Sequence, residues 1–182
     1  MKSPIRRLAP LMIIALFLVG VLNAARLSCA VSQETQRGAV THVYDGDTIE
    51  VRGKGKVRLI GVDTLDGHNE EKMWEQARRL GLSPQSVKTW AQKATEFVRE
   101  RVLDKEVRLE PGPEARGDYG RLLAYVSYAS DGAKKNLNKL LLEKGLAVAY
   151  RKYEHPRRDQ FVRLERAARK NREGLWQEAS YR

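Results

Sequence analysis

The chain contains very little cysteine and histidine, which excludes several kinds of covalent or metal-based support. Its single cysteine, Cys29, excludes a disulfide within one chain. The three histidines, His42, His68 and His155, do not share the spacing of metal ligands, and we interpret all three as surface residues. The sequence also shows no internal repeat and no low-complexity tract. The domain is therefore expected to fold without a covalent cross-link.

Only one long stretch lacks charge, and it lies at the N-terminus. Residues 8–25 are uncharged and follow three basic residues, a pattern typical of a secretory signal. The small residues Ser28 and Ala30 have the spacing of a signal-peptidase site, which predicts cleavage after Ala30. The alternative is a membrane anchor, although the 18 residues of this stretch are barely enough to span a bilayer.

The residues before Cys29 also resemble a lipoprotein processing site. Arg26 stands where such sites have an apolar residue, so lipidation is the less favoured alternative. We predict an exported protein, secreted or periplasmic, with anchoring through residues 8–25 as the alternative. The predicted divisions are a signal peptide or anchor, a flexible lead-in, one globular domain and a short tail: 1–30, 31–37, 38–178 and 179–182.

The composition beyond residue 30 is that of one basic domain. The chain has 182 residues, of which 42% are hydrophobic and 31% charged, enough for one domain with a core and too few for two. Its net charge is +11, and residues 1–30 hold four basic residues and no acid, so the remainder keeps +7. This charge indicates an anionic partner, either nucleic acid or a phospholipid surface.

The first part of the domain is predicted to form three strands in a meander. The stretches 38–44, 47–53 and 56–63 are rich in β-branched residues and are separated by Asp-Gly and Gly-Lys-Gly turn sequences. Asp-Gly between strands is typical of a two-residue hairpin, whose turn needs a positive φ. We therefore expect Asp45 and Gly46 to form the turn and Asp47 to open the second strand.

Helices and further strands follow. Ser83 and Pro84 predict the start of a helix with apolar residues at helical spacing, whereas residues 67–82 fit either a short helix or a long surface loop. Two strands, a helix ending at Gly145 and a last helix complete the order: 106–111, 119–128, about 137–145 and about 156–171. This order predicts an α+β, mainly β domain with a partly closed five-stranded OB-fold barrel, and a split α+β sheet is the alternative.

Two aspartates and two arginines stand out as candidates for chemistry. If the second strand lies between the first and third, Asp47 approaches Asp63, and two carboxylates with a backbone carbonyl suit a hard cation such as Ca²⁺. A straight strand would place Arg58 on the opposite side from Asp63 unless it bends or bulges. Arg121, at the start of a predicted strand, has the planar group that binds a phosphate through two parallel hydrogen bonds.

The order of these motifs resembles the staphylococcal nuclease, or thermonuclease, family. The resemblance covers nearly all of residues 38–176, through DGDT, VRLIGVDT, YGRLLAYV, LNKLLLEKGLA and the terminal GLW. Each motif alone is weak, but five in this order form a specific pattern. The resemblance implies an OB barrel with three helices and hydrolysis of DNA and RNA phosphodiesters with Ca²⁺.

The resemblance also implies roles for individual residues. For the metal, it implies two carboxylate ligands, a carbonyl ligand and one further nearby acid: Asp47, Asp63, Thr64 and Asp45. For the substrate, it implies two arginines on the reacting phosphate and two tyrosines lining the nucleotide pocket: Arg58, Arg121, Tyr119 and Tyr150. Taken singly, these residues have ordinary interpretations as turn, capping, surface or packing residues.

The chain departs from the family at Leu65 and Asp66, where the family usually has proline and a glutamate proposed as the general base. Asp66 can accept a proton, but its carboxylate is one methylene shorter, and losing proline loosens the backbone there. Asp118 also stands where the family often has a basic residue.

These features together predict an exported, monomeric, Ca²⁺-dependent endonuclease that acts on DNA, RNA or both and uses Asp66 as its base. A catalytically weakened nucleic-acid-binding module on the same fold is the alternative. A membrane-tethered basic domain that binds anionic surfaces is a third and less favoured hypothesis.

Overall fold

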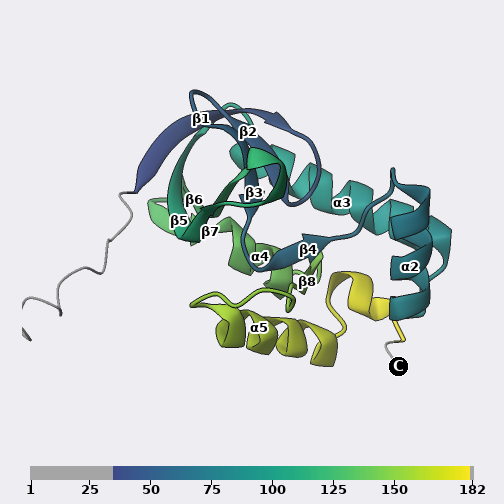
Figure 1. The fold of residues 1–182 in the computed structure, drawn as a ribbon. Helices are drawn as coiled ribbons and strands as arrows, with labels where there is room; N and C mark the ends of the chain where they lie inside the picture. The colour runs from purple at the N-terminus through teal and green to yellow at the C-terminus, as the bar shows by residue number, and fades with distance from the viewer. Residues whose placement is uncertain (1–34, 181–182) are drawn as a thin grey trace, which may run out of the picture. The chain divides into compact units, whose positions relative to one another are not determined.

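The computed structural model describes residues 35–180 (Figure 1). The predicted signal segment, Cys29 and the first four residues of the lead-in therefore lie outside the described residues. Within the described range, none of the helices combines the length and apolar character needed to cross a membrane.

Five strands close into a barrel, and their pairing gives the topology of an OB fold. The strands are β1 (Gln36–Val43), β2 (Thr48–Val51), β3 (Gly55–Leu59), β5 (Glu106–Arg116) and β6 (Leu122–Ser130). Antiparallel pairs join β3 to β2, β2 to β1, β1 to β5 and β5 to β6, and a parallel pairing of β3 with β6 closes the ring. A sixth strand, β7 (Ala133–Asn136), extends this sheet beyond β6. The predicted OB-fold barrel is confirmed.

A second, two-stranded sheet arises from a bend that the sequence analysis did not predict. We expected one continuous strand over residues 56–63, but the structure divides it into β3 and β4 (Val62–Thr64). Gly61 adopts a φ of 74°, a left-handed conformation that glycine adopts readily, and the chain turns there. Strand β4 therefore leaves the barrel and pairs antiparallel with β8 (Ala147–Ala149).

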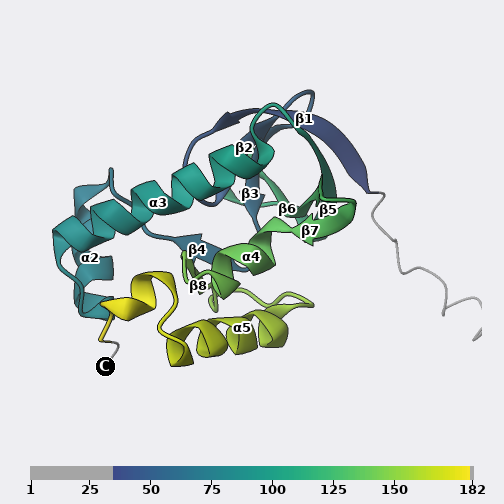
Figure 2. The same cartoon turned by 180° about the vertical axis from the view of Figure 1, so that it is seen from behind.

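Four α-helices lie in the described range, whereas the family resemblance implied three. They are α2 (Glu70–Leu80), α3 (Pro84–Val102), α4 (Leu137–Glu143) and α5 (Arg158–Lys170), with short 3₁₀ helices η1 (Asp118–Gly120) and η2 (Gly174–Gln177). Helix α3 lies along the barrel and extends to α2, and α4 lies between the barrel and α5 (Figures 1 and 2).

Local residues explain where these helices begin. Ser83 accepts a hydrogen bond from the Ser86 N–H and Pro84 occupies the first turn, which confirms the predicted start of α3. Asn69 caps α2 in the same way, and Gly81 ends that helix in the left-handed conformation. Residues 67–82 are thus mainly helix rather than loop. The last helix begins at Arg158, two residues later than expected.

One histidine has a different environment from the one expected. His155 is half-buried, because its ring packs against Phe161 at 5.4 Å between centroids and its Nδ1 lies 2.9 Å from the Tyr125 hydroxyl. Burial lowers the pKa of His155, and the positive charge of Arg158 lowers it further. His42 and His68 are exposed, as predicted.

Candidate active site

The connection from β1 to β2 places Asp47 in the interior. Asp45 Oδ1 accepts a hydrogen bond from the Asp47 N–H at 2.8 Å, and the Tyr44 N–H donates to the Thr48 carbonyl at 3.0 Å. The connection therefore has four residues, and β2 opens at Thr48. The prediction of a two-residue hairpin turn at Asp45 and Gly46 is wrong, since neither residue has a positive φ.

Gly46 is required for close packing rather than for turn geometry. A Cβ at this position would lie 2.7 Å from Thr64 Cγ2 and 2.8 Å from Ala94 Cβ. Carbon atoms do not approach this closely without a shift of the neighbouring backbone. The turn is thus packed directly against β4 and α3.

Asp47 connects the barrel to β4. Its side chain is buried, with 1% of the residue exposed, and its Oδ2 accepts hydrogen bonds from the Thr64 N–H at 2.8 Å and the Thr64 hydroxyl at 3.0 Å. The Thr48 hydroxyl donates to Oδ1 at 3.2 Å. Burial raises the pKa of neighbouring Asp45, and the charge of Arg58 opposes that rise.

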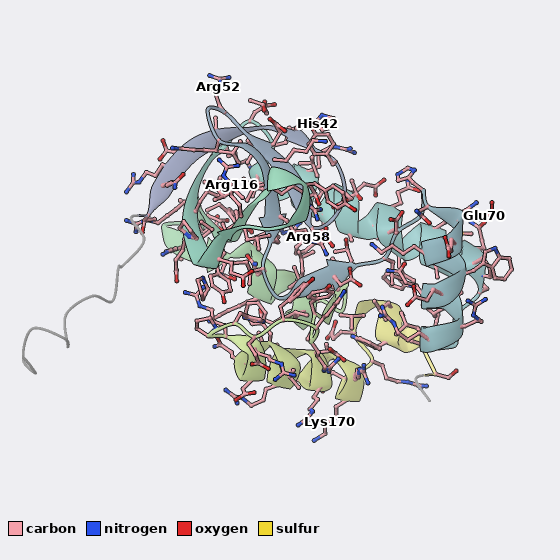
Figure 3. The ribbon with its side chains drawn as sticks, viewed as in Figure 1. His42, Arg52, Arg58, Glu70, Arg116 and Lys170 are labelled. Atoms are coloured by element: carbon pink, nitrogen blue, oxygen red, sulfur yellow. The ribbon has the colours of Figure 1, made fainter. Side chains whose placement is uncertain are left out.

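Arg58 bridges two buried aspartates. Figure 3 labels Arg58. Its Nη1 forms an ion pair with Asp47, and its Nη2 lies 3.2 Å from Asp63 Oδ1 and 3.3 Å from the Val62 carbonyl. A straight strand would place Arg58 and Asp63 on opposite sides, and the bend at Gly61 brings the two side chains together. Burial lowers the pKa of the Arg58 guanidinium, and the carboxylates of Asp63 and Asp45 oppose this shift.

Helix α2 contributes two further cations that the sequence analysis missed. Lys72 Nζ lies 3.9 Å from Asp63 Oδ1, and Arg79 Nη2 lies 3.6 Å from Asp63 Oδ2. Lys72 also lies 3.6 Å from Asp66 Oδ2 and so connects the two aspartates. Their helical spacing could have identified them, but the sequence did not decide whether residues 67–82 form a helix or a loop.

Gln76 was also missed, and it holds the backbone where the family usually has proline. It is 2% exposed; its Oε1 accepts from the Asp66 N–H at 2.8 Å, and its Nε2 donates to the Thr64 carbonyl at 3.4 Å. The amide therefore fixes both ends of the Thr64–Asp66 segment. A side chain on α2 supplies restraint that proline would otherwise supply.

Replacing Gln76 with alanine should release this segment. The Asp66 N–H and the Thr64 carbonyl would lose their partner, and we expect the free energy of unfolding to fall by about 1–3 kcal/mol. Urea unfolding measures the loss, and amide hydrogen exchange should speed up at Asp66. Gln85→Ala, an exposed change at the start of α3, is the control; equal stability of the two variants would refute a restraining role for Gln76.

One carboxylate oxygen of Asp66 is hydrogen-bonded within its own loop. Its Oδ1 accepts hydrogen bonds from the His68 N–H at 2.9 Å and the Asn69 N–H at 3.0 Å, while Oδ2 faces Lys72. Desolvation raises the pKa of Asp66, but these two N–H donors and Lys72 outweigh it, so the pKa is lowered overall. The carboxylate is therefore ionised at neutral pH, with one oxygen occupied by the loop.

Arg121 follows η1 and has a donor available. Its Nε is buried and has no hydrogen-bond partner within residues 35–180, and its charge lowers the pKa of Arg58.

The two tyrosines predicted to line the nucleotide pocket have different environments. Tyr119 is 95% exposed, at a φ of 65°, with its ring centroid 5.8 Å from the Arg121 guanidinium carbon. Tyr150 lies at the bend, where its N–H donates to the Gly61 carbonyl at 3.0 Å, and its ring is 5.7 Å from Tyr153.

The oxygen atoms at the centre of this cluster fit a hard divalent cation. Asp47 and Asp63 are both nearly buried and share one guanidinium, so the site brings two carboxylates to a single positive group. Across residues 35–180, no group of three or more His, Cys, Asp or Glu residues forms a metal-binding cluster. A cation held by two carboxylates and the Thr64 carbonyl would need further oxygens from water or a phosphate.

Comparison with known proteins identifies the family of this chain. The family model described as staphylococcal nuclease homologue matches residues 56–178. The chain belongs to the staphylococcal nuclease family. A thermonuclease of Staphylococcus hyicus is 32% identical over 164 residues, which cover 86% of this chain and 83% of that protein.

Other relatives span the same region. A protein of Methanocaldococcus jannaschii described as uncharacterized is 34% identical over 153 residues, 80% of this chain and 73% of its own. A micrococcal nuclease of Shigella flexneri is 29% identical over 148 residues, 77% and 73% of the two chains. This member of the staphylococcal nuclease family therefore resembles its nuclease relatives over most of their length.

Proposed function

We propose that the protein is a Ca²⁺-dependent nuclease that hydrolyses phosphodiester bonds of DNA, RNA or both. The observation that carries this proposal is the pair of buried carboxylates, Asp47 and Asp63, bridged by Arg58. Relatives named thermonuclease and micrococcal nuclease support the reaction class. The basic net charge supports an anionic polymer as substrate.

Asp47, Asp63 and the Thr64 carbonyl are the groups that would hold the cation. When bound, it supplies Lewis-acid polarisation of a phosphoryl oxygen. Arg58 and Arg121 bind the non-bridging oxygens of the reacting phosphate and stabilise the charge that grows during attack. The buried, unpaired Nε of Arg121 supports this role, because a phosphate oxygen would satisfy it.

Asp66 takes the proton of the attacking water through Oδ2, since Oδ1 already accepts two backbone N–H groups. Its lowered pKa keeps it ionised but makes it a weak base. The water oxygen forms a bond to phosphorus, the bond from phosphorus to the 5′ oxygen breaks, and that oxygen takes a proton from solvent.

The test is degradation of plasmid DNA and of RNA by the purified protein, with Ca²⁺ or with a chelator. We expect cleavage of at least one substrate with Ca²⁺ and none with the chelator. Binding to nucleic acid without chelator-sensitive cleavage would overturn the enzyme and favour the binding-module alternative.

Substitutions at Asp66 test the general base. Asp66→Asn keeps an oxygen for the His68 and Asn69 N–H groups but cannot take a proton, so kcat should fall by about 10²–10⁴-fold. Asp66→Glu restores the longer side chain usual in the family and should raise kcat above wild type. An Asp66→Asn enzyme with unchanged kcat would remove Asp66 from the mechanism.

Export is a separate part of the proposal and rests on residues 1–30 alone. We propose that the signal is cleaved after Ala30 and that the domain acts outside the cytoplasm. Mass determination of the mature N-terminus checks this: a chain that begins at Val31 is expected, and a retained or lipidated N-terminus would contradict it.

A further inference from the structure

One face of α2 is directed at the candidate active site. Lys72, Gln76 and Arg79 are spaced four and then three residues apart, which puts them on the same side of a helix. Each contacts the segment from Asp63 to Asp66. Figure 3 labels Glu70, at the start of this helix. None of the family motifs in the sequence covers α2.

The two cations on this face are loosely held. Their distances to Asp63, 3.9 Å for Lys72 and 3.6 Å for Arg79, exceed those of good hydrogen bonds, and their side chains are 40% and 39% exposed. Arg58, by contrast, is 18% exposed and hydrogen-bonded to Asp63 at 3.2 Å. Ion pairs with partly exposed cations at these distances contribute little to stability, and Asp63 keeps its hydrogen bond from Arg58, so both cations can turn toward a ligand at low cost.

The placement of Arg79 separates it from the arginines proposed to bind the reacting phosphate. Arg58 and Lys72 approach Asp63 from Oδ1, with Lys72 also beside Asp66, whereas Arg79 approaches from Oδ2. The Asp63 carboxylate therefore lies between the two guanidinium groups, and one phosphate bound to Arg58 would leave Arg79 unused.

Charge balance indicates a second anion. The cluster has four acids and four cations: Asp45, Asp47, Asp63, Asp66, Arg58, Lys72, Arg79 and Arg121. A divalent cation adds two positive charges, and the single charge of one phosphodiester offsets only half of them. The next phosphodiester of the same strand would neutralise the remainder.

We propose that Lys72 and Arg79 form a second phosphate site, which binds the phosphodiester next to the one that reacts. This inference rests on the proposed nuclease function and makes a strand with at least two consecutive phosphodiesters its preferred substrate. Gln76 positions the site, because it fixes α2 against Thr64 and Asp66.

Kinetics on two substrates test the proposal in the full chain. The double variant Lys72→Ala/Arg79→Ala is compared with Arg78→Ala, the exposed neighbour of Arg79, on a dinucleoside monophosphate and on a single-stranded decanucleotide. The double variant should raise KM about tenfold more for the decanucleotide than for the dinucleoside monophosphate. The slope of log KM against log salt should fall by about 1.4 for the decanucleotide, since each of the two cations accounts for about 0.7 of this slope on a single strand.

Equal changes of KM on both substrates would overturn the proposal, because they would mean that the cations act only through Asp63. A second readout needs no catalysis: fluorescence anisotropy of a labelled decanucleotide with chelator. The double variant should bind more weakly than Arg78→Ala, and equal affinity would refute the site. Failure of the nuclease function can be told apart from failure of the second phosphate site. If the nuclease function fails, wild type cleaves neither substrate, and the anisotropy measurement still shows whether Lys72 and Arg79 bind the decanucleotide.

Discussion

Replacing Arg58 with alanine should lower kcat by about 10³–10⁵-fold, the range observed when a phosphate-stabilising arginine is removed. The guanidinium is the only group seen to contact both Asp47 and Asp63 among the described residues. Its loss removes a donor from the charge that grows on the phosphate and leaves two buried carboxylates facing each other. Steady-state kinetics on DNA and RNA measure the effect.

The same variant reports on metal binding. Without a cation, repulsion between Asp47 and Asp63 should lower the melting temperature, and Ca²⁺ should raise it more in Arg58→Ala than in wild type, since a bound ligand stabilises the folded state. Arg52→Ala, an exposed arginine in the β2–β3 turn, is the matched control and should match wild type. A kcat within about tenfold of wild type for Arg58→Ala would contradict its proposed role.

The second large effect is expected on stability, at Glu165. This glutamate of α5 is fully buried; its Oε2 accepts from the Ala149 N–H at 2.8 Å and lies 3.0 Å from Arg151, and its Oε1 pairs with Arg169. Glu165→Ala removes the acceptor of a backbone N–H and one ion-pair partner of each of two cations. We expect the free energy of unfolding to fall by about 2–5 kcal/mol, because a buried backbone N–H loses its acceptor and the removed side chain leaves a cavity.

Glu165→Gln separates charge from hydrogen bonding. Its amide oxygen can still accept from Ala149, so urea unfolding should show a smaller loss than for Glu165→Ala. Glu143→Gln, at an exposed glutamate of α4, is the control and should change stability by less than about 0.5 kcal/mol. A Glu165→Ala protein as stable as this control would show that the buried network contributes nothing.

Features with local causes were predicted from the sequence. Ser83 and Pro84 identify the start of α3 through capping, and the turn between β2 and β3 follows from glycines that adopt positive φ at residues 53 and 55. The OB barrel follows from the order of strands and helices. The helix start and the β2–β3 turn depend on residues close together in the chain, so a single sequence contains the information. The barrel instead closes by pairing distant strands, and its prediction rested on the order of the elements and on the family resemblance.

Features with tertiary causes were not predicted. Gly46 was assigned to a turn, but packing against Thr64 and Ala94 requires it. The contact of Arg58 with Asp63 conflicts with strand alternation, and only the bend at Gly61 removes the conflict. Sequence spacing does not show that β3 ends at Leu59 and that β4 then pairs with a different strand. The sequence therefore predicted contact between Arg58 and Asp63 only if the strand bent or bulged.

The missed residues on α2 have the same explanation. Lys72, Gln76 and Arg79 act on Asp63, Thr64 and Asp66 across a connection whose structure the sequence left open. Their helical spacing is visible, but it identifies a shared face without saying what that face contacts. Only the three-dimensional arrangement relates that face to the candidate active site.

The pairing of β4 with β8 also constrains the order of assembly. Asp63 pairs with Val148, 85 residues later, so β4 lacks its partner strand until the ribosome has passed residue 149. Contacts this distant in the chain carry a large loop-closure entropy and slow folding. A nascent chain released before Ala147 would carry every proposed metal and phosphate residue, from Asp45 to Arg121, and is expected to leave them unassembled. The proposed hydrolysis is therefore expected only from chains in which Ala147–Ala149 have been synthesised and β4 has paired with β8.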